Sequence, residues 1–412
     1  MTQPDRGRRK MNSSDNQPWD NPRWVTSRHN FAPEIAIPPR PVKLHDLTLR
    51  DGEESADLAF TTADKIRIAE KLARLGIKRT EIFLTVPGWE EVIRAFMARD
   101  LGMDLWVTWQ PGRVEKALDL GTRHVMVWHH IGDDFQKHVF GTNRTEFLDK
   151  TLAEIRAAKA AGCTVNLFMP ESTRGDLDNI MAVAKAAEAE GADAVTVVDS
   201  QGIARPAAIA FLVGKLKAET KMEVEVHCHN DFGLAVANVL GGYEGGADVL
   251  QVSVNGIGYR AGNAAMETVA AALAMVYGAE TGVDLTRLPD ICREVAEISG
   301  IPNGYYSPIV GEGAFRYEQW RSIRAFEDAG ERRQGFPFEP EVVGRSPELV
   351  IGKWSDTGAV IQKLADYALT ATPNQLSRIL KRSQRAGTAR HRPLEDHEFL
   401  VIAEEEGAVD KA

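Results

Sequence analysis

The sequence is short of cysteine, of long apolar runs and of excess basic charge. Its 412 residues include only three cysteines, widely spaced and without a CxxC pair, so neither a disulfide framework nor a thiolate zinc site is expected. No stretch approaches the roughly 18 consecutive apolar residues that a membrane-spanning helix requires. A formal net charge of -10 argues against broad nucleic-acid binding. These absences predict a cytoplasmic protein with neither a membrane nor a nucleic-acid partner.

The two ends of the chain lack the pattern of its centre. The start is basic and polar, without the apolar stretch of a signal peptide, so we expect residues 1–41 to form a flexible arm. Residues 279–412 have helical patterning without strand alternation. They are expected to form a helical linker or lid that also serves oligomerisation. The part after about residue 382 is charged and weakly periodic, which fits either a helical tail or a disordered one.

One unit recurs between residues 42 and 278: an apolar, β-branched run, a polar turn, an amphipathic helix and a glycine that ends the helix. Eight such units predict an α/β fold, a parallel (β/α)8 TIM barrel. An open doubly wound sheet is the alternative with the same alternation. The expected strands are residues 43–49, 80–84, 104–109, 124–130, 164–170, 194–200, 224–230 and 249–255.

The strongest local signal is His227-Cys228-His229 at the end of the seventh expected strand. Because side chains alternate along a strand, both histidines would face the barrel axis at the mouth, where TIM-barrel chemistry lies. Asp51, after the first strand, can add a carboxylate, and Asn263, after the eighth, an amide oxygen. This mixed oxygen and nitrogen set predicts one divalent metal ion, Mg²⁺, Mn²⁺ or Zn²⁺. The alternative is a pair of hydrogen-bonded core histidines.

Two further features of the expected barrel mouth bear on function. Glu81 lies inside an apolar strand, where a charge needs a buried partner, and Arg50 at the first strand end can supply it. The segment GIGYRAG after the eighth strand has the spacing GxGxxxG rather than GxGxxG and lacks the expected acid, which argues against dinucleotide binding. A glycine-rich loop there favours close approach of the backbone to a substrate.

Taken together and in order, five motifs resemble the metallolyase superfamily of 2-isopropylmalate, homocitrate and citramalate synthases, which also contains 3-hydroxy-3-methylglutaryl-CoA lyase. The resemblance covers most of residues 42–278. The segments GEGAF and FPFEPEVVGRSPELVIGKWSDTGAV also resemble the linker that follows the barrel in the synthase branch. The five motifs are DLTLRDGEE, TEIF, VVDSQGIARP, VHCHNDFGLAVAN and NGIGYRAGNAAMETV.

The resemblance implies a divalent metal held by Asp51, His227 and His229, with Asn263 on it or close to it. The metal would chelate a 2-oxo or 2-hydroxy acid, and the second substrate would be an acyl-CoA. Three residues would act in catalysis: Arg50 on the developing oxygen charge, Glu81 on the orientation of that arginine, and Glu171 near the acyl donor. Candidate substrate contacts are Gly52, Ser200, Arg260, His129, His130 and Tyr317.

Departures from the synthase pattern concentrate after the barrel. Ser322 replaces a histidine that serves in acid/base catalysis in the synthases, and serine does not carry protons near neutral pH. Trp354 replaces a second histidine. Tyr317, His129 or His130 would have to substitute as the proton carrier. The lyase branch carries a catalytic cysteine in its glycine loop, and GIGYRAGN has none.

Three hypotheses of function follow. The first is Claisen-type condensation of an acyl-CoA, such as acetyl-CoA, with a 2-oxo acid to a 2-hydroxy dicarboxylate. The alternative is a retro-aldol or retro-Claisen lyase acting on a 2-hydroxy acid or its CoA ester. A catalytically reduced binding homologue comes third, and the intact Asp51, His227 and His229 set argues against it. By analogy with the synthases, a homodimer is expected, and the segment after the linker is too short for a feedback-regulatory domain of about 100 residues.

Overall fold

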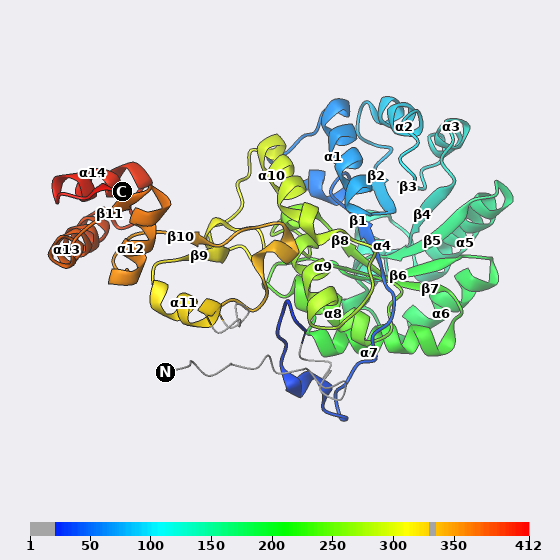
Figure 1. The fold of residues 1–412 in the computed structure, drawn as a ribbon. Helices are drawn as coiled ribbons and strands as arrows, with labels where there is room; N and C mark the ends of the chain where they lie inside the picture. The colour runs from blue at the N-terminus through cyan, green and yellow to red at the C-terminus, as the bar shows by residue number, and fades with distance from the viewer. Residues whose placement is uncertain (1–20, 329–334, 412) are drawn as a thin grey trace. The chain divides into compact units, whose positions relative to one another are not determined.

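The computed structural model describes residues 21–328 and 335–411. Eight parallel strands close into a barrel in the order of the sequence, and helices surround them (Figure 1). This confirms the (β/α)8 TIM barrel and excludes the open doubly wound sheet. The strands are β1 (Lys43–Asp46), β2 (Arg79–Ile82), β3 (Asp104–Thr108), β4 (His124–Trp128), β5 (Thr164–Met169), β6 (Ala194–Asp199), β7 (Glu223–Cys228) and β8 (Val249–Val252).

Most of these strands are shorter than the apolar runs from which they were predicted, because they end before the run does. β1 pairs with β8 in the register Lys43↔Val249 and Asp46↔Val252, which closes the barrel. The chain then leaves the ladder, and a 3-10 helix, η2, occupies Asp51–Glu54. The residues that extend the predicted strands therefore form the loops of the barrel mouth. This arrangement places polar side chains at the carboxyl ends of the strands, as expected for a TIM barrel.

Local sequence signals explain where the barrel helices begin and end. In α1 the Thr61 side chain accepts from Asp64 N, the Asp64 carboxylate binds the Thr61 backbone in return, and Gly76 ends the helix at φ 102°. The outer helices are α1 (Thr62–Leu75), α2 (Trp89–Met97), α3 (Val114–Asp119), α4 (Asp133–Val139), α5 (Arg144–Ala160), α6 (Leu177–Ala189), α7 (Pro206–Glu219), α8 (Ala235–Glu244) and α9 (Met266–Met275).

The barrel unit extends beyond the predicted boundary at residue 278. Residues 38–314 form one compact unit, because α10 (Leu288–Ser299) packs against α1. Lys71 Nζ lies 2.6 Å from Asp290 Oδ2, and Arg67 pairs with Glu294. The first helix after the eighth unit is thus part of the barrel domain.

The predicted N-terminal arm falls partly outside the described residues. Within its described part, a 3-10 helix covers Arg28–Phe31, and Trp24 forms an isolated bridge with Phe338. Closer to the barrel, Arg40 N donates to Tyr243 Oη over 2.9 Å, and the Arg40 guanidinium lies 4.2 Å from the centre of that ring. These contacts tie the end of the predicted arm to the barrel unit.

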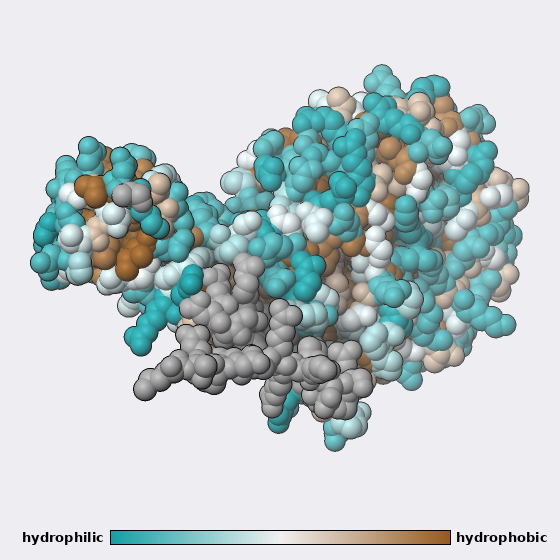
Figure 2. All heavy atoms as spheres, viewed as in Figure 1, coloured by the Kyte–Doolittle hydropathy of each residue, from teal (hydrophilic) through white to brown (hydrophobic). Residues whose placement is uncertain are grey.

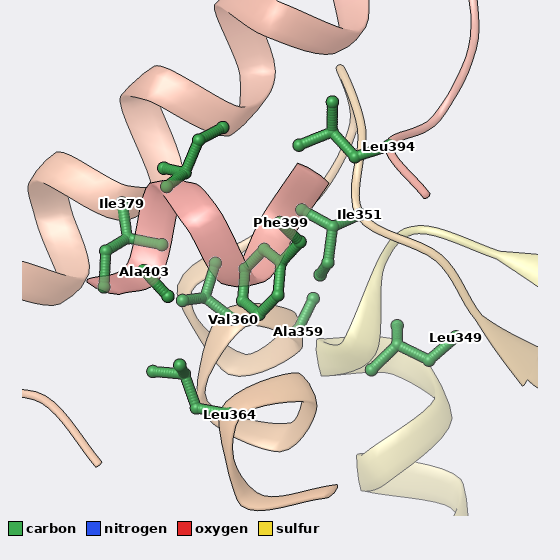
Figure 3. Packing of buried hydrophobic residues seen from close by; sticks show 10 residues of the cluster. Leu349, Ile351, Ala359, Val360, Leu364, Ile379, Leu394, Phe399 and Ala403 are labelled. Atoms are coloured by element: carbon green, nitrogen blue, oxygen red, sulfur yellow. The ribbon is translucent and has the colours of Figure 1, made fainter. Parts of the chain in front are cut away.

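Residues from Phe315 onward, with the described residues up to Ile37, form a second compact unit. Its hydrophobic core surrounds the fully buried Phe399, which packs with Val360 and Ile379 (Figure 3). Two short strand pairs, β9–β10 and β11–β12, depart from the expected purely helical pattern. The elements are β9 (Arg316–Tyr317), α11 (Trp320–Asp328), β10 (Glu348–Leu349), α12 (Thr357–Asp366), β11 (Leu369–Thr370), α13 (Pro373–Arg390), α14 (Asp396–Glu405) and β12 (Val409–Asp410).

The surface of the barrel unit is predominantly polar. Figure 2 shows hydrophilic residues over most of its visible face, with smaller hydrophobic patches between them. Within residues 21–328 and 335–411, we find no helix with the length and apolar character needed to cross a bilayer.

Candidate active site

A cavity of about 560 Å³ opens at the mouth of the barrel. Its walls come from the carboxyl ends of several strands and from α4. This is where the fold is expected to place chemistry. The lining residues are Arg50, Asp51, Glu54, Trp128, His130, Asp134, Phe135, His138, Val139, Phe168, Pro170, Glu171, Arg174, Val198, Ser200, Gln201, His227, His229, Tyr259 and Arg260.

Three of these side chains converge as the sequence predicts. His227 and His229 lie two residues apart on the extended end of β7, and their Nε2 atoms are 3.2 Å apart. Asp51 Oδ2 lies 3.5 Å from His227 Nε2 and 3.8 Å from His229 Nε2. Among the described residues, this is the one group of three histidine, cysteine or acidic side chains close enough to share a metal ion.

Neighbouring groups fix the orientation of this cluster. His227 Nδ1 lies 3.1 Å from Gln251 Oε1, so Nδ1 carries the hydrogen and Nε2 keeps its lone pair. Asp51 Oδ1 accepts from Asn263 Nδ2 over 2.7 Å and from Tyr259 N over 3.1 Å. These contacts direct the imidazole nitrogens and the other carboxylate oxygen, Oδ2, toward one point.

The absence of a side chain at Gly258 makes room for this cluster. A Cβ atom at Gly258 would lie 2.1 Å from Asn263 Nδ2 and 2.7 Å from Asp51 Oδ1. Both distances are far below contact distance, and both atoms belong to the metal cluster. The glycine-rich loop is therefore shaped around the predicted ligands, and the sequence indicated only that the loop allows close approach of the backbone.

The electrostatics of the cluster suit a cation. Burial would raise the pKa of Asp51, but the Arg50 guanidinium and the hydrogen bond from Asn263 outweigh it and hold that pKa below its usual value. Burial lowers the pKa of both His227 and His229, so both imidazoles are neutral. Two neutral nitrogens and an ionised oxygen thus face one point. The chemistry of these donors fits a divalent ion.

Asn263 is placed to add a fourth donor to the cluster. Its Oδ1 is buried and has no hydrogen-bond partner among the described residues. An amide oxygen is a suitable ligand for a hard divalent cation. The same side chain, through Nδ2, already holds Asp51.

Arg50 is enclosed by carboxylates beside the cluster. Its Nε lies 2.5 Å from Glu81 Oε1, and its Nη1 lies 2.9 Å from Asp51 Oδ2. Burial would lower the pKa of Arg50, but these carboxylates outweigh it and raise that pKa. Its Nη2 is buried and has no hydrogen-bond partner among the described residues. Arg50, which lines the cavity, therefore keeps one unpaired donor, and the predicted partnership with Glu81 is present.

Glu81 extends this contact into the barrel interior. Its Oε2 lies 3.2 Å from His45 Nε2, and both side chains are fully buried. Burial would lower the pKa of His45, but the adjacent carboxylates of Glu225 and Glu81 outweigh it and raise that pKa. A charged chain thus runs from the interior to Arg50 and fixes its side chain. His45 was not identified as a candidate functional residue from the sequence, although its place inside the first expected strand would have marked it as one.

Glu171 is poised at the opposite wall of the cavity. It follows β5 in the left-handed conformation, with φ 66°, and its Oε2 is buried without a hydrogen-bond partner. Its backbone N donates to Ser200 Oγ over 2.7 Å. A Cβ atom at Gly132 would lie 2.4 Å from Oε2, so a glycine leaves the space that this carboxylate fills.

The remaining predicted substrate contacts divide into two groups. Ser200, Arg260 and His130 line the cavity, and Arg260 pairs with Asp231 over 2.8 Å. His129 does not line it: the side chain is buried, and Nδ1 lies 2.8 Å from Thr151 Oγ1.

Gly52 also lies outside the cavity lining. Gly52 is buried, with its backbone N bonded to Leu47 O over 3.0 Å. Tyr317 belongs to the second compact unit, where its ring stacks on Trp320. In the same unit, the backbone of Trp354 donates to the Glu318 carboxylate over 2.5 Å, and Ser322 lies on α11.

Sequence reasoning missed the wall that α4 contributes. Phe135, His138 and Val139 lie on this short helix after β4, and Trp128 and Phe168 lie at the ends of β4 and β5. Neither of the two ring systems was a candidate contact from the sequence. The segment Asp133–Val139 was part of the expected connection and gave no functional signal beyond its place after a strand end.

Comparison with known proteins identifies the family. The family model described as HMGL-like matches residues 41–295, more than half of the chain. The chain belongs to the HMGL-like family. A protein named "Homocitrate synthase AksA" from Methanopyrus kandleri is 34% identical over 358 residues, covering 86% of this chain and 90% of that protein. A "2-isopropylmalate synthase 2" from Caldanaerobacter subterraneus is 32% identical over 373 residues, covering 89% and 96%.

Among solved structures, this HMGL-like chain is similar to hydroxymethylglutaryl-CoA lyase from Pseudomonas aeruginosa. That similarity has a TM-score of 0.59 and 25% sequence identity, and it covers 65% of this chain and 95% of the lyase. The recognised superfamily is thereby confirmed. The curated relatives are synthases that span nearly the whole chain, whereas the structural match covers about two thirds of it.

Proposed function

We propose that the chain catalyses a metal-dependent Claisen-type condensation of an acyl-CoA, acetyl-CoA in the first place, with a 2-oxo acid. The product would be a 2-hydroxy dicarboxylate. The observation that carries the proposal is the convergence of Asp51, His227 and His229 beside the free Nη2 of Arg50 in one cavity. The names of the full-length relatives, homocitrate synthase and 2-isopropylmalate synthase, support the same reaction class.

Binding of the 2-oxo acid follows from the cluster and from Arg50. A divalent ion held by Asp51, His227 and His229 would supply Lewis-acid polarisation of the oxo group. Arg50 would donate from Nη2 to the oxygen on which negative charge develops. Because Glu81 and Asp51 already hold the guanidinium, this donor is in place before the reaction begins.

Carbon–carbon bond formation requires a proton acceptor near the methyl group of the acyl-CoA. We assign this role to the Glu171 carboxylate, which is buried, lacks a partner at Oε2 and lines the same cavity. Removal of the proton gives the thioester enolate, which attacks the oxo carbon, and the oxo oxygen takes up the proton that Glu171 removed and becomes a hydroxyl. Water then cleaves the thioester, releasing the carboxylic acid and the CoA thiol.

This assignment keeps the proton transfer within the barrel unit. The synthase histidine is replaced by Ser322, which lies in the second unit. Of the three residues expected to substitute for it, His130 lines the cavity, and burial lowers its pKa to about 4, so it is a neutral imidazole at pH 7. His130 is therefore the second candidate for proton transfer after Glu171.

The test is an incubation of the purified chain with Mg²⁺, acetyl-CoA and a panel of 2-oxo acids, scored by free thiol. Release of thiol that depends on the 2-oxo acid is the expected result. The second candidate, a carbon–carbon lyase, is favoured by the similarity to hydroxymethylglutaryl-CoA lyase. Cleavage of 2-hydroxy acids or their CoA esters, without thiol release in the first assay, would replace the proposal by the lyase.

Two expectations accompany the proposal. We propose a homodimer, by resemblance to the synthases, which light scattering after gel filtration would measure directly. A cytoplasmic location stays a prediction, consistent with three cysteines that are buried and free.

A further inference from the structure

We propose that the acceptor is a 2-oxo acid with an aromatic side chain, held against the wall formed by Trp128, Phe168, Phe135 and Val139. We call these four residues the aromatic wall; all four line the cavity. This inference rests on the proposed condensation and names the substrate class of the same site. None of the four residues was a candidate contact from the sequence.

The aromatic wall begins next to the groups that would hold the 2-oxo acid. The Phe168 ring centre lies 5.5 Å from that of His227. The guanidinium carbon of Arg50 lies 5.7 Å from the centre of the Trp128 ring and 5.6 Å from that of Phe168. A molecule whose carboxylate and oxo group engage these polar groups therefore has its third carbon beside aromatic faces.

The wall then continues outward as further aromatic surface. The Trp128 and Phe168 rings stack with centres 4.8 Å apart. His130 is stacked on Phe135, with ring centres 4.1 Å apart and planes 1° from parallel. Val139 is 60% exposed at the end of α4, so apolar surface reaches the rim. Flat ring faces of this kind are suited to a planar apolar group.

The cavity lacks a free cation for a second carboxylate. Each of the three arginines among its described lining residues lies beside a carboxylate: Arg50 contacts Glu81 and Asp51 and keeps only the Nη2 donor assigned to the oxo oxygen, and Arg260 pairs with Asp231. The third, Arg174, approaches Glu171 at 3.4 Å and is half exposed.

The charge that remains in the lining is largely negative. Asp134 and Glu171 add two carboxyl groups to the walls, burial raises the pKa of a third, Glu54, to about 7, and burial holds His130 neutral. His138 is exposed at the rim. A dicarboxylic acceptor would meet repulsion and no free partner, whereas an aromatic side chain buries apolar surface.

The volume of the cavity is also compatible with an aromatic ring on the substrate. At about 560 Å³ the cavity lies within the roughly 300–1,000 Å³ that small-molecule sites occupy. A small acceptor such as pyruvate would leave the aromatic wall in contact with water. A phenyl ring would cover it, and this difference should appear in the rate.

The first experiment measures kcat/KM for four acceptors with acetyl-CoA and Mg²⁺: phenylpyruvate, 2-oxoisovalerate, pyruvate and 2-oxoglutarate. Phenylpyruvate is expected to be the best, by roughly tenfold or more over 2-oxoisovalerate, since each added apolar group in a fitting pocket changes selectivity by about 10–200-fold. A higher kcat/KM for any of the other three would overturn the inference while leaving the condensation intact.

Direct binding separates this inference from the proposed reaction. If no acceptor releases thiol, the condensation fails, but calorimetry of the Mn²⁺-loaded protein still compares phenylpyruvate with 2-oxoglutarate. Tighter binding of phenylpyruvate would uphold the aromatic wall. Equal or weaker binding would refute it.

Two variants test the wall itself. Phe135→Ala is expected to lower kcat/KM for phenylpyruvate about tenfold and to lower that for pyruvate much less. Phe211→Ala removes a ring that is 53% exposed on α7, outside the cavity, and serves as the matched control. Val139→Asp, at an exposed position that folding does not require, should reproduce the selective loss. An equal loss for both acceptors, or none for phenylpyruvate, would contradict the role of the wall.

Discussion

Substitution of Gly132 by alanine tests the position of the Glu171 carboxylate without touching Glu171 itself. The added Cβ would lie 2.4 Å from Glu171 Oε2 and 3.0 Å from its Cδ. Carbon and oxygen atoms normally approach to about 3.3 Å, so Oε2 must move by about 1 Å. Gly132 has φ -73° and ψ 121°, which alanine adopts without strain. The flexible carboxylate, rather than the backbone, is therefore expected to give way.

The expected effect is large on catalysis and small on stability. A misplacement of about 1 Å can cost about 100-fold in rate, which corresponds to about 3 kcal/mol. Gly132 is the N-cap of α4, where alanine is poorer than glycine by at most about 1 kcal/mol. We therefore predict a kcat about 100-fold lower, with an unchanged metal affinity and a melting temperature within a few degrees of the parent.

The control is Gly214→Ala, which adds the same methyl group on α7 with only one atom within 4 Å, at 3.8 Å. It should leave kcat unchanged and stabilise the helix slightly. Thiol release measures kcat, thermal unfolding measures the melting temperature, and metal titration measures the metal affinity. A Gly132→Ala enzyme with more than half of the parental kcat would refute the assignment of Glu171. The assignment would also be refuted if the loss of kcat were accompanied by an equal loss of folded protein or of bound metal.

Three other changes have defined outcomes. His227→Ala should abolish binding of one equivalent of Mn²⁺ measured by calorimetry, and full occupancy with full activity would refute the ligand assignment. Arg50→Lys should lower kcat by roughly 100-fold, because the single ammonium nitrogen of lysine cannot span Glu81 and the substrate oxygen as the planar guanidinium does, while Mn²⁺ affinity changes less than kcat; a kcat within a few-fold of the parent would argue against the donor. Burial raises the pKa of Glu267 to about 7, above its value in the unfolded chain, so its contribution to stability is present below about pH 4.5 and is lost as pH rises to about 7. Glu267→Gln should therefore flatten the fall in unfolding free energy between pH 5 and 7.5 by up to about 3 kcal/mol in urea titrations, and an unchanged slope would contradict the shift.

The barrel could be predicted because its signal is periodic and local. Six of the eight apolar runs were followed by an amphipathic helix and a glycine, and these glycines, interpreted as helix stops, all have positive φ: Gly76, Gly102, Gly121, Gly162, Gly191 and Gly246. The pairing of β1 with β8 then follows from closure of eight strands. The alternation of His227 and His229 about Cys228 was equally local and placed both imidazoles correctly on one face.

The parts that could not be predicted depend on side-chain direction and on packing between segments far apart in the sequence. His129 and His130 are adjacent at one strand end, so the sequence treats them alike. In the fold they diverge: His129 bonds Thr151 on α5, while His130 stacks on Phe135 of α4 and lines the cavity. Only the packing of α4 and α5 decides which of the two reaches the mouth.

The extent of the barrel domain was hidden for a similar reason. α10 has an amphipathic pattern like the helices that follow it, and no strand precedes it. Its membership of the barrel unit rests on ion pairs with α1, between residues more than 200 positions apart, such as Lys71 and Asp290. The aromatic wall could not be predicted for the same reason. Trp128 and Phe168 are residue types that are typical of a hydrophobic core, and only the fold turns them toward the cavity.

The most direct test of the condensation follows the carbon atoms. The chain is incubated with Mg²⁺, acetyl-CoA labelled with ¹³C at the methyl carbon, and the acceptor panel, and the products are analysed by ¹³C NMR and mass spectrometry. The label should appear in a methylene group bonded to the carbon that carries the new hydroxyl, with one CoA thiol per product, and His227→Ala should form none. Label found only in acetate, or no labelled product with any acceptor, would contradict the proposal.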